Sequence, residues 1–128
     1  MLSQEEIVRV CALVVSTATG IDPLSRKERR GDHDLQYARA VWIHLIIVEC
    51  GLDRGAAEYH CKRSLRAISY YLSEVEQWRT DTRFDACLER WGETVRFLTS
   101  MFAFDLNAVA PSRRERQITR AGLVQRAA

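Results

Sequence analysis

Apolar residues recur along this chain at intervals of three and four positions, which is the spacing of one face of an α-helix. No stretch alternates apolar and polar residues with the two-residue period of a β-strand. The pattern therefore predicts an all-α protein of five to six helices. Its single folded domain is expected to span residues 1–110, followed by a basic tail over residues 111–128.

The first helix is expected to begin after Ser3 and to end at Gly20. Ser3 and Glu6 have the spacing of a capping box, in which each side chain accepts a hydrogen bond from the other residue's backbone N–H. Glycine is the residue that most often follows the last turn of a helix. Residues 20–33 are expected to form a loop, with one helical turn at its start.

The run "VWIHLIIV" (41–48) is apolar on nearly all sides, which predicts that a helix over residues 34–50 is the central, buried one. His44 within it is expected to be a satisfied core group. Arg39 fits two roles, a clamp on a phosphate or a structural ion pair. The acidic partners available for such a pair are Asp34, Asp53 and Glu58.

Three further helices follow in the second half of the chain. Asp53 is placed to cap a short helix over residues 54–60, and Arg63 or Ser64 begins a longer helix that runs to residue 78. Thr82 begins the last helix. The inward face of this last helix is expected to consist of Phe84, Cys87, Leu88, Trp91, Val95 and Leu98.

The segment "CKRSLRAISYYLSEVEQWR" (61–79) has one apolar and one polar helical face. The apolar face is predicted to hold Leu65, Ile68, Leu72 and Val75. The opposite face holds Arg63, Arg66, Ala67, Tyr70 and Ser73, with no carboxylate before Glu74. This polarity fits two structures, a solvated face of a helical bundle or a helix that lies in a DNA groove.

A short helix, a tight turn and a longer helix with a polar face form the helix-turn-helix arrangement, whose second helix enters the major groove of DNA. Arg66 and Tyr70 lie one turn apart and are placed to reach base edges. Lys62 and Arg63 lie at the start of the same helix, near the DNA backbone. The N-terminus of a helix itself favours a phosphate.

Basic residues gather in two other segments, although the formal net charge is only +2. Residues 112–128 carry five arginines and one glutamate, and "SRKERR" (25–30) is locally basic. The net charge predicts no nucleic-acid binding by itself, and any basic footprint is therefore focal rather than global. The tail fits two roles, phosphate contacts or a solvated segment.

The sequence gives little support for disulfide bonds, a membrane span, a zinc site or an enzyme active site. The four cysteines form no C-x-x-C pair and no signal peptide is evident, which favours reduced thiols in a cytoplasmic protein. The run "VCALVVSTA" is too short to cross a membrane. His33, His60 and Cys61 lack the spacing of zinc ligands. No phosphate-binding loop, nucleophile elbow or carboxylate pair occurs, so neither an enzyme nor a cofactor is expected.

Several short motifs follow one another along the chain in an order that can be compared with known families. Residues 22–85 contain Leu24, Ser25 and Arg29/Arg30, then Ala38, Arg39, His44 and Leu45, then Gly51–Leu52, and finally Val75–Glu76, Arg79, Asp81, Phe84 and Asp85. In this order and spacing the chain resembles, over about residues 5–92, the C-terminal DNA-binding domain of the bacterial replication initiator DnaA. It is more similar still to small stand-alone proteins built from that domain.

The resemblance implies a Trp-repressor-like helical fold that binds duplex DNA without the ATPase module. The basic loop would approach the minor groove and phosphates, and the recognition helix would read the major groove. Phosphates would then be contacted by Arg26, Lys27, Arg29, Arg30, Lys62 and Arg63. Arg66 and Tyr70 would reach base edges, with Ser64 and Ala67 near the groove floor.

The reading segment departs from that family. Arg63-Ser64-Leu65-Arg66-Ala67-Ile68 stands where the family has Arg-Asp-His-Thr-Thr-Val, so the donors and acceptors offered to the bases differ. Either another DNA sequence is read, chiefly through Arg66 to guanine, or base reading has been lost.

Two functions therefore remain open. The first is a cytoplasmic, nucleoid-associated transcriptional regulator that binds double-stranded DNA. The second is a protein-interaction module that kept the fold and lost sequence-specific DNA binding. The apolar run "RFLTSMFAFDL" (96–106) fits either a partner surface or a homodimer through the helix over residues 84–106.

Overall fold

The computed structural model describes residues 2–25 and 33–101. Within these residues the chain is all-helical, as the sequence pattern predicts, and contains no strand. The elements in chain order are α1 (Gln4–Thr19), α2 (His33–His44), the π-helical turn η1 (Leu45–Glu49), α3 (Arg54–Cys61), α4 (Leu65–Trp78) and α5 (Thr82–Met101). The predicted basic loop residues Arg26, Lys27, Arg29 and Arg30 lie outside the described residues, as do residues 102–128.

The predicted ends of α1 are confirmed. Ser3 Oγ accepts a hydrogen bond from the Glu6 N–H at 3.2 Å, and the Glu6 carboxylate accepts one from the Ser3 N–H, which completes the capping box. Gly20 ends the helix with φ +75° and donates its N–H to the Ser16 carbonyl. That left-handed backbone conformation is readily available to glycine.

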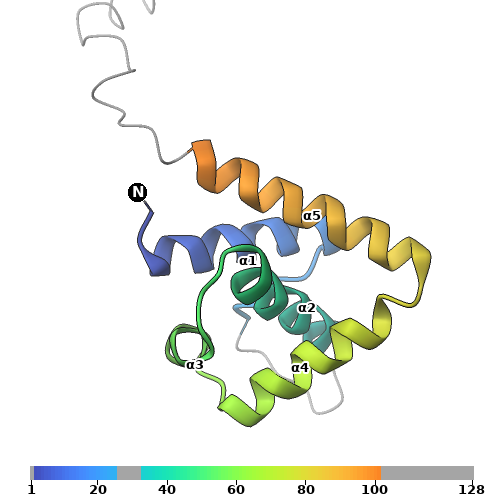
Figure 1. Ribbon diagram of the computed structural model, residues 1–128, viewed down its shortest axis with the longest axis horizontal. Helices are drawn as coiled ribbons and strands as arrows, with labels where there is room; N and C mark the ends of the chain where they lie inside the picture. The colour runs from blue at the N-terminus through green and yellow to red at the C-terminus, as the bar shows by residue number, and fades with distance from the viewer. Residues whose placement is uncertain (1, 26–32, 102–128) are drawn as a thin grey trace, which may run out of the picture.

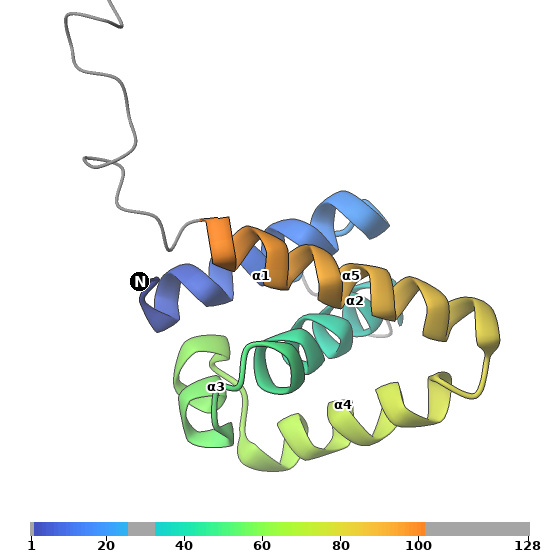
Figure 2. The same ribbon diagram turned by 45° about the horizontal axis from the view of Figure 1, so that its top comes forward.

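Helix α2 occupies the centre of the molecule. Figures 1 and 2 show it between α4 on one side and α1 with α5 on the other. The core side chains that are fully shielded from solvent come from several helices and include Cys11, Val15, Val41, Ile43, Leu45, Ile46, Ile68, Val75 and Val95. The prediction that the run over residues 41–48 forms the buried centre is thus confirmed for residues 41–46, while Val48 is 53 % exposed.

The expected helix over residues 34–50 ends in a wider turn. From Leu45 to Glu49 the backbone is π-helical, and the Cys50 N–H donates to the Leu45 carbonyl five residues earlier. Such single π-turns are rare and insert extra backbone into a helix. The apolar pattern did not predict this widening, because a run that is apolar on nearly all sides shows no shift in the register of buried positions.

His44, immediately before η1, is 1 % exposed, and its Nδ1 has no hydrogen-bond partner among the described residues. The expectation of a satisfied core group is therefore wrong for this atom. Burial lowers the pKa of His44 below its ordinary value of 6.5, an effect that nearby Glu76 opposes. The imidazole is neutral in the folded protein at neutral pH.

Two buried side chains of α2 donate hydrogen bonds to backbone carbonyls near the beginning of the chain. Trp42 Nε1 donates to the Val8 carbonyl of α1 at 3.0 Å. Arg39, which is 4 % exposed, donates to the carbonyls of Ser25 at 2.7 Å and Pro23 at 3.5 Å. None of its three predicted acidic partners pairs with it among the described residues. Arg39 holds the segment before α2 against that helix, a structural role.

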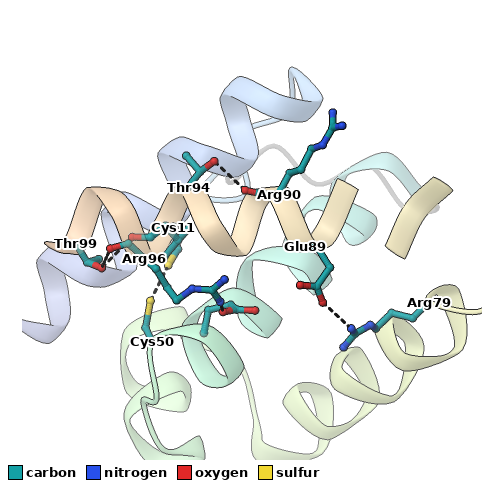
Figure 3. Close-up of polar contacts among 10 residues, drawn as sticks. Cys11, Cys50, Arg79, Glu89, Arg90, Thr94, Arg96 and Thr99 are labelled. Atoms are coloured by element: carbon teal, nitrogen blue, oxygen red, sulfur yellow. Dashed lines mark hydrogen bonds and ion pairs between the residues drawn. The ribbon is translucent and has the colours of Figure 1, made fainter. Parts of the chain in front are cut away.

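The corner between α4 and α5 is held by Arg79. Its guanidinium contacts carboxylate oxygens of Asp85 at 2.7 Å, Glu89 at 3.0 Å and Glu76 at 3.7 Å, and the pair with Glu89 is visible in Figure 3. These carboxylates, Asp85 first, raise the pKa of Arg79 above its ordinary value. The network fixes the direction in which α5 leaves α4.

Helix α5 packs on α1 and η1 through a stripe that includes Leu88, Gly92 and Val95. Gly92 permits a close approach, because a Cβ there would lie 2.7 Å from the Glu49 carboxyl group, which pairs with Arg96. Cys87 was predicted to face inward but is exposed. It lies one position off the stripe, since the helical repeat places residues 88, 91, 92 and 95 on the buried side.

No helix in the described ranges is both long and apolar enough to span a bilayer.

Candidate nucleic-acid interface

Helices α3 and α4 are joined by three residues, Lys62 to Ser64. In Figure 1, α3 is seen nearly end-on while α4 runs across the picture, so the two axes cross. A short helix, a three-residue turn and a longer crossing helix is the geometry expected of a helix-turn-helix. The helix bounds agree with the predicted ones to within one residue.

Local side-chain caps define both helices of this unit. Asp53 Oδ1 accepts from the Ala56 N–H at 2.7 Å at the start of α3, and Ser64 Oγ accepts from the Ala67 N–H at 3.1 Å at the start of α4. Ser64 rather than Arg63 is therefore the N-cap of α4. Ser64 is exposed, so its hydroxyl group can donate a hydrogen bond to a ligand while it accepts one from Ala67.

The turn requires an unusual backbone at Lys62, which caps α3 with φ +55° and ψ +43°. It has the only positive φ among the described non-glycine residues. The left-handed region costs a residue with a Cβ about 1–2 kcal/mol, and glycine far less. A lysine at this position is therefore strained, and it projects a cation from the point where the chain turns toward α4.

The inner faces of both helices anchor the unit to the core. Ala57, Cys61, Ile68 and Val75 are buried. Arg54 Nη1, at the start of α3, also donates to Ser69 Oγ of α4 at 2.9 Å, which links the two helices directly. Because these contacts fix α4 from within, its outer face is presented on a rigid element.

The outer face of α4 carries the two predicted base-contacting residues. Arg66 is exposed and Tyr70 is 58 % exposed, one helical turn further on. Within the described residues the Arg66 guanidinium makes no hydrogen bond or ion pair. Its five N–H donors are available to acceptors outside the protein.

The remaining predicted contacts on this unit differ in accessibility. Lys62 is exposed, whereas Arg63 and Ala67 are half-buried. Leu65, predicted to face the core, is 48 % exposed. It is the first residue of α4 and lies at the end of that helix beyond the packed middle, so helical periodicity alone misplaced it.

A groove beside the turn adds a cation that the sequence analysis missed. The groove has a volume of about 960 Å³, and Arg9 of α1 lines it together with Lys62 and Arg63. Arg9 is exposed and pairs with Glu5 at 3.1 Å. In the sequence this pair looks like an ordinary stabilising contact four residues apart, and only the packing of α1 beside α3 brings Arg9 to this groove.

The electrostatic character changes along α4. Arg63 and Arg66 lie at its start, where the backbone N–H groups also favour anions, whereas Glu74 and Glu76 lie in its second half. A polyanion is therefore favoured at the start of α4 and disfavoured near its end. The predicted phosphate contacts at residues 26, 27, 29 and 30 lie outside the described residues.

In the described part of the chain no group of three His, Cys, Asp or Glu side chains could hold a metal ion. In comparisons with known proteins, no family model, no curated protein and no solved structure matches this chain.

Proposed function

We propose that this protein binds duplex DNA through α3, the Lys62–Ser64 turn and α4, and that it acts as a transcriptional regulator on the nucleoid. Helix α4 is the recognition helix. One observation carries the proposal: Arg66 and Tyr70 are exposed one turn apart on α4, and Arg66 has no acceptor among the described residues. An exposed arginine on a helix of this kind is suited to the O6 and N7 acceptors of guanine.

The start of α4 supports phosphate contacts beside this base contact. Lys62 is exposed at the turn, and the groove lined by Arg9, Lys62 and Arg63 continues the cationic surface toward α1. Phosphate contacts position a protein on DNA, and base contacts give it specificity. In this proposal Lys62 and Arg63 do the first and Arg66 does the second.

Binding to a labelled duplex of mixed sequence, followed by anisotropy at several salt concentrations, tests the proposal. The logarithm of the binding constant is expected to fall linearly with the logarithm of salt concentration, by about 0.9 for each phosphate contacted. No binding at any salt concentration would refute the proposal.

The matched variants are Arg66→Ala and Arg90→Ala. Both remove an exposed arginine, but Arg90 lies on α5, which Figure 1 places on the other side of α2 from α4. Arg66→Ala is expected to lose about 1–3 kcal/mol on a duplex selected from a random pool, and to relax the preference at one base. Arg90→Ala is expected to bind as the wild type does.

A second candidate function is binding to another protein. Phe97 and Met101, four residues apart near the end of α5, are 64 % and 49 % exposed. Such a pair is suited to an apolar partner surface or to a homodimer through α5; the remainder of that predicted surface, residues 102–106, lies outside the described residues. Sedimentation of the wild type and of Phe97→Ser tests for self-association and leaves the DNA measurement independent.

A further inference from the structure

A second pocket lies away from the helix-turn-helix turn, between the first turns of α2 and the second half of α4. These helices lie side by side in Figures 1 and 2 and make the most extensive helix–helix contact in the described chain. The pocket has a volume of about 680 Å³, within the usual range for small-molecule sites. Of the residues that line it, only Tyr70 belongs to the predicted DNA-contacting set.

One wall of the pocket is aromatic. The rings of Tyr37 and Trp78 lie 5.1 Å apart between centroids, and each lies 5.9 Å from the ring of Phe84. All three side chains are half-buried, so they pack on one another and still present ring surface to the pocket. Burial raises the pKa of the Tyr37 phenol, which therefore stays neutral.

The remaining lining residues are acidic or polar, and they include one histidine, His33. Asp34, Glu74 and Asp81 line the pocket, and no lysine or arginine does so among the described residues. Asp81 uses Oδ1 to accept hydrogen bonds from the N–H groups of Arg83 and Phe84 at the start of α5. The side-chain carboxylates of Asp34 and Glu74 make no hydrogen bond or ion pair within the described ranges.

We infer that this pocket binds a small organic cation, an ammonium or guanidinium group attached to an apolar body. The apolar body would lie against Tyr37, Trp78 and Phe84, and the charged group between Asp34 and Glu74. Aromatic faces attract cations through their negative quadrupole, and nearby carboxylates add to that attraction. The chain as a whole carries a net charge of +2, so this acidic lining is a local feature and not a reflection of overall composition.

The same arrangement disfavours other ligands. An anion would meet three carboxylates and no lysine or arginine among the described lining residues. A neutral apolar molecule would gain the aromatic contacts alone and leave Asp34 and Glu74 unpaired. The inference concerns the pocket by itself and does not depend on DNA binding.

Phenethylamine, 2-phenylethanol and phenylacetate are the probes that test the charge requirement, since they share a phenyl ring and differ in charge. Two-dimensional ¹H–¹⁵N NMR of the full chain follows the indole Nε1–H signals. The Trp78 signal is expected to shift saturably with phenethylamine, because Trp78 lines the pocket, while the signal of buried Trp42 stays in place. The alcohol is expected to bind several-fold more weakly, and the carboxylate not at all.

Matched variants identify the charged groups. Glu74→Gln is expected to weaken phenethylamine binding about two- to fivefold, the usual effect of one partly exposed charge. The double variant Asp34→Asn/Glu74→Gln is expected to weaken it further. Glu93→Gln, on an exposed face of α5 outside the pocket, is the control and is expected to leave binding unchanged.

Four results would overturn the inference. The first is the absence of any saturable Trp78 shift. The second is equal binding of the amine and the alcohol, and the third is equal binding of the amine by the wild type and the double variant. The fourth is that Glu74→Gln, without any ligand, changes the NMR signals of the arginines in residues 26–30 or 113–120, because the chain's own cations would then occupy the pocket.

Discussion

The Sγ atom of Cys11, on the buried face of α1, lies 3.6 Å from the Sγ atom of Cys50, where the chain leaves η1 (Figure 3). Both thiols are reduced, and 39 residues separate them in the sequence. The hydrogen bond between them lowers the pKa of Cys50 and raises that of Cys11, which burial raises further. Cys50 is therefore the thiol that ionises first, and it is also the more accessible of the two.

This pairing predicts selective cross-linking by diamide. The Cys50 thiolate adds to the N=N bond of the reagent, and the Cys11 sulfur then displaces the reduced hydrazine to form the disulfide. The sulfurs need to approach only from 3.6 Å to about 2.05 Å. Peptide mapping is expected to find a Cys11–Cys50 link in the wild type and in Cys87→Ser, and none in Cys50→Ser. A Cys61-containing link in the wild type would contradict the assignment.

The strained backbone of Lys62 predicts opposite effects on stability and DNA binding. Lys62→Gly is expected to raise the free energy of unfolding by about 1 kcal/mol, because glycine adopts the left-handed conformation without a Cβ clash. It also removes an exposed cation, so the salt slope of DNA binding is expected to fall by about one unit. Chemical denaturation and DNA titration measure the two effects.

Lys62→Gln is the matched control for that prediction. It removes the charge and retains the Cβ, so it is expected to reproduce the loss of DNA binding without the gain in stability. Equal stability of the glycine and glutamine variants would show that the turn is not strained at this residue.

The neutral, buried His44 predicts a loss of stability in acid. The pKa of His44 in the folded protein lies below its ordinary value of 6.5, so the unfolded chain binds a proton there first as the pH falls. The contribution of neutral His44 to the free energy of unfolding is fully present above that ordinary pKa. This contribution is lost as the pH falls through 6.5 toward the lowered pKa of the folded state.

Urea denaturation between about pH 8 and about pH 5 measures this effect. His44→Leu is expected to flatten the decline, since leucine does not titrate and has a similar volume. His33 and His60 remain in both proteins and so contribute equally. A decline of unchanged size in His44→Leu would assign the acid sensitivity to other groups.

The Arg79 network predicts a modest and specific loss of stability. Arg79→Ala removes the contacts to Asp85 and Glu89 and leaves three carboxylates close together at the corner between α4 and α5. Because these groups are partly exposed, the expected loss is about 1 kcal/mol. It should diminish at high salt, which screens the carboxylates from one another. Arg83→Ala, an exposed arginine in the next turn, is expected to cost less.

The caps and helix bounds could be predicted from sequence because they depend on neighbours two or three residues away. Ser3 with Glu6, Asp53 and Ser64 each satisfy backbone N–H groups of the turn that follows them. The exposure of Arg66 and Tyr70 also followed from helical periodicity alone. Periodicity failed at Leu65 and Cys87, one at a helix end and the other at the edge of a buried stripe, where a neighbouring helix decides which positions are covered.

The sequence by itself determined the helical class, the three capped helix starts and the polar face of α4, since hydrogen bonds and spacings within one or two turns specify each of these. Tertiary packing alone decided which distant groups meet. It placed Cys11 beside Cys50, Arg9 beside the turn at Lys62, and Asp34 and Glu74 around an aromatic pocket. The physical reason is the separation of the interacting residues along the chain. A cap joins residues within one helical turn, whereas a groove or pocket joins residues from different helices and depends on how those helices pack.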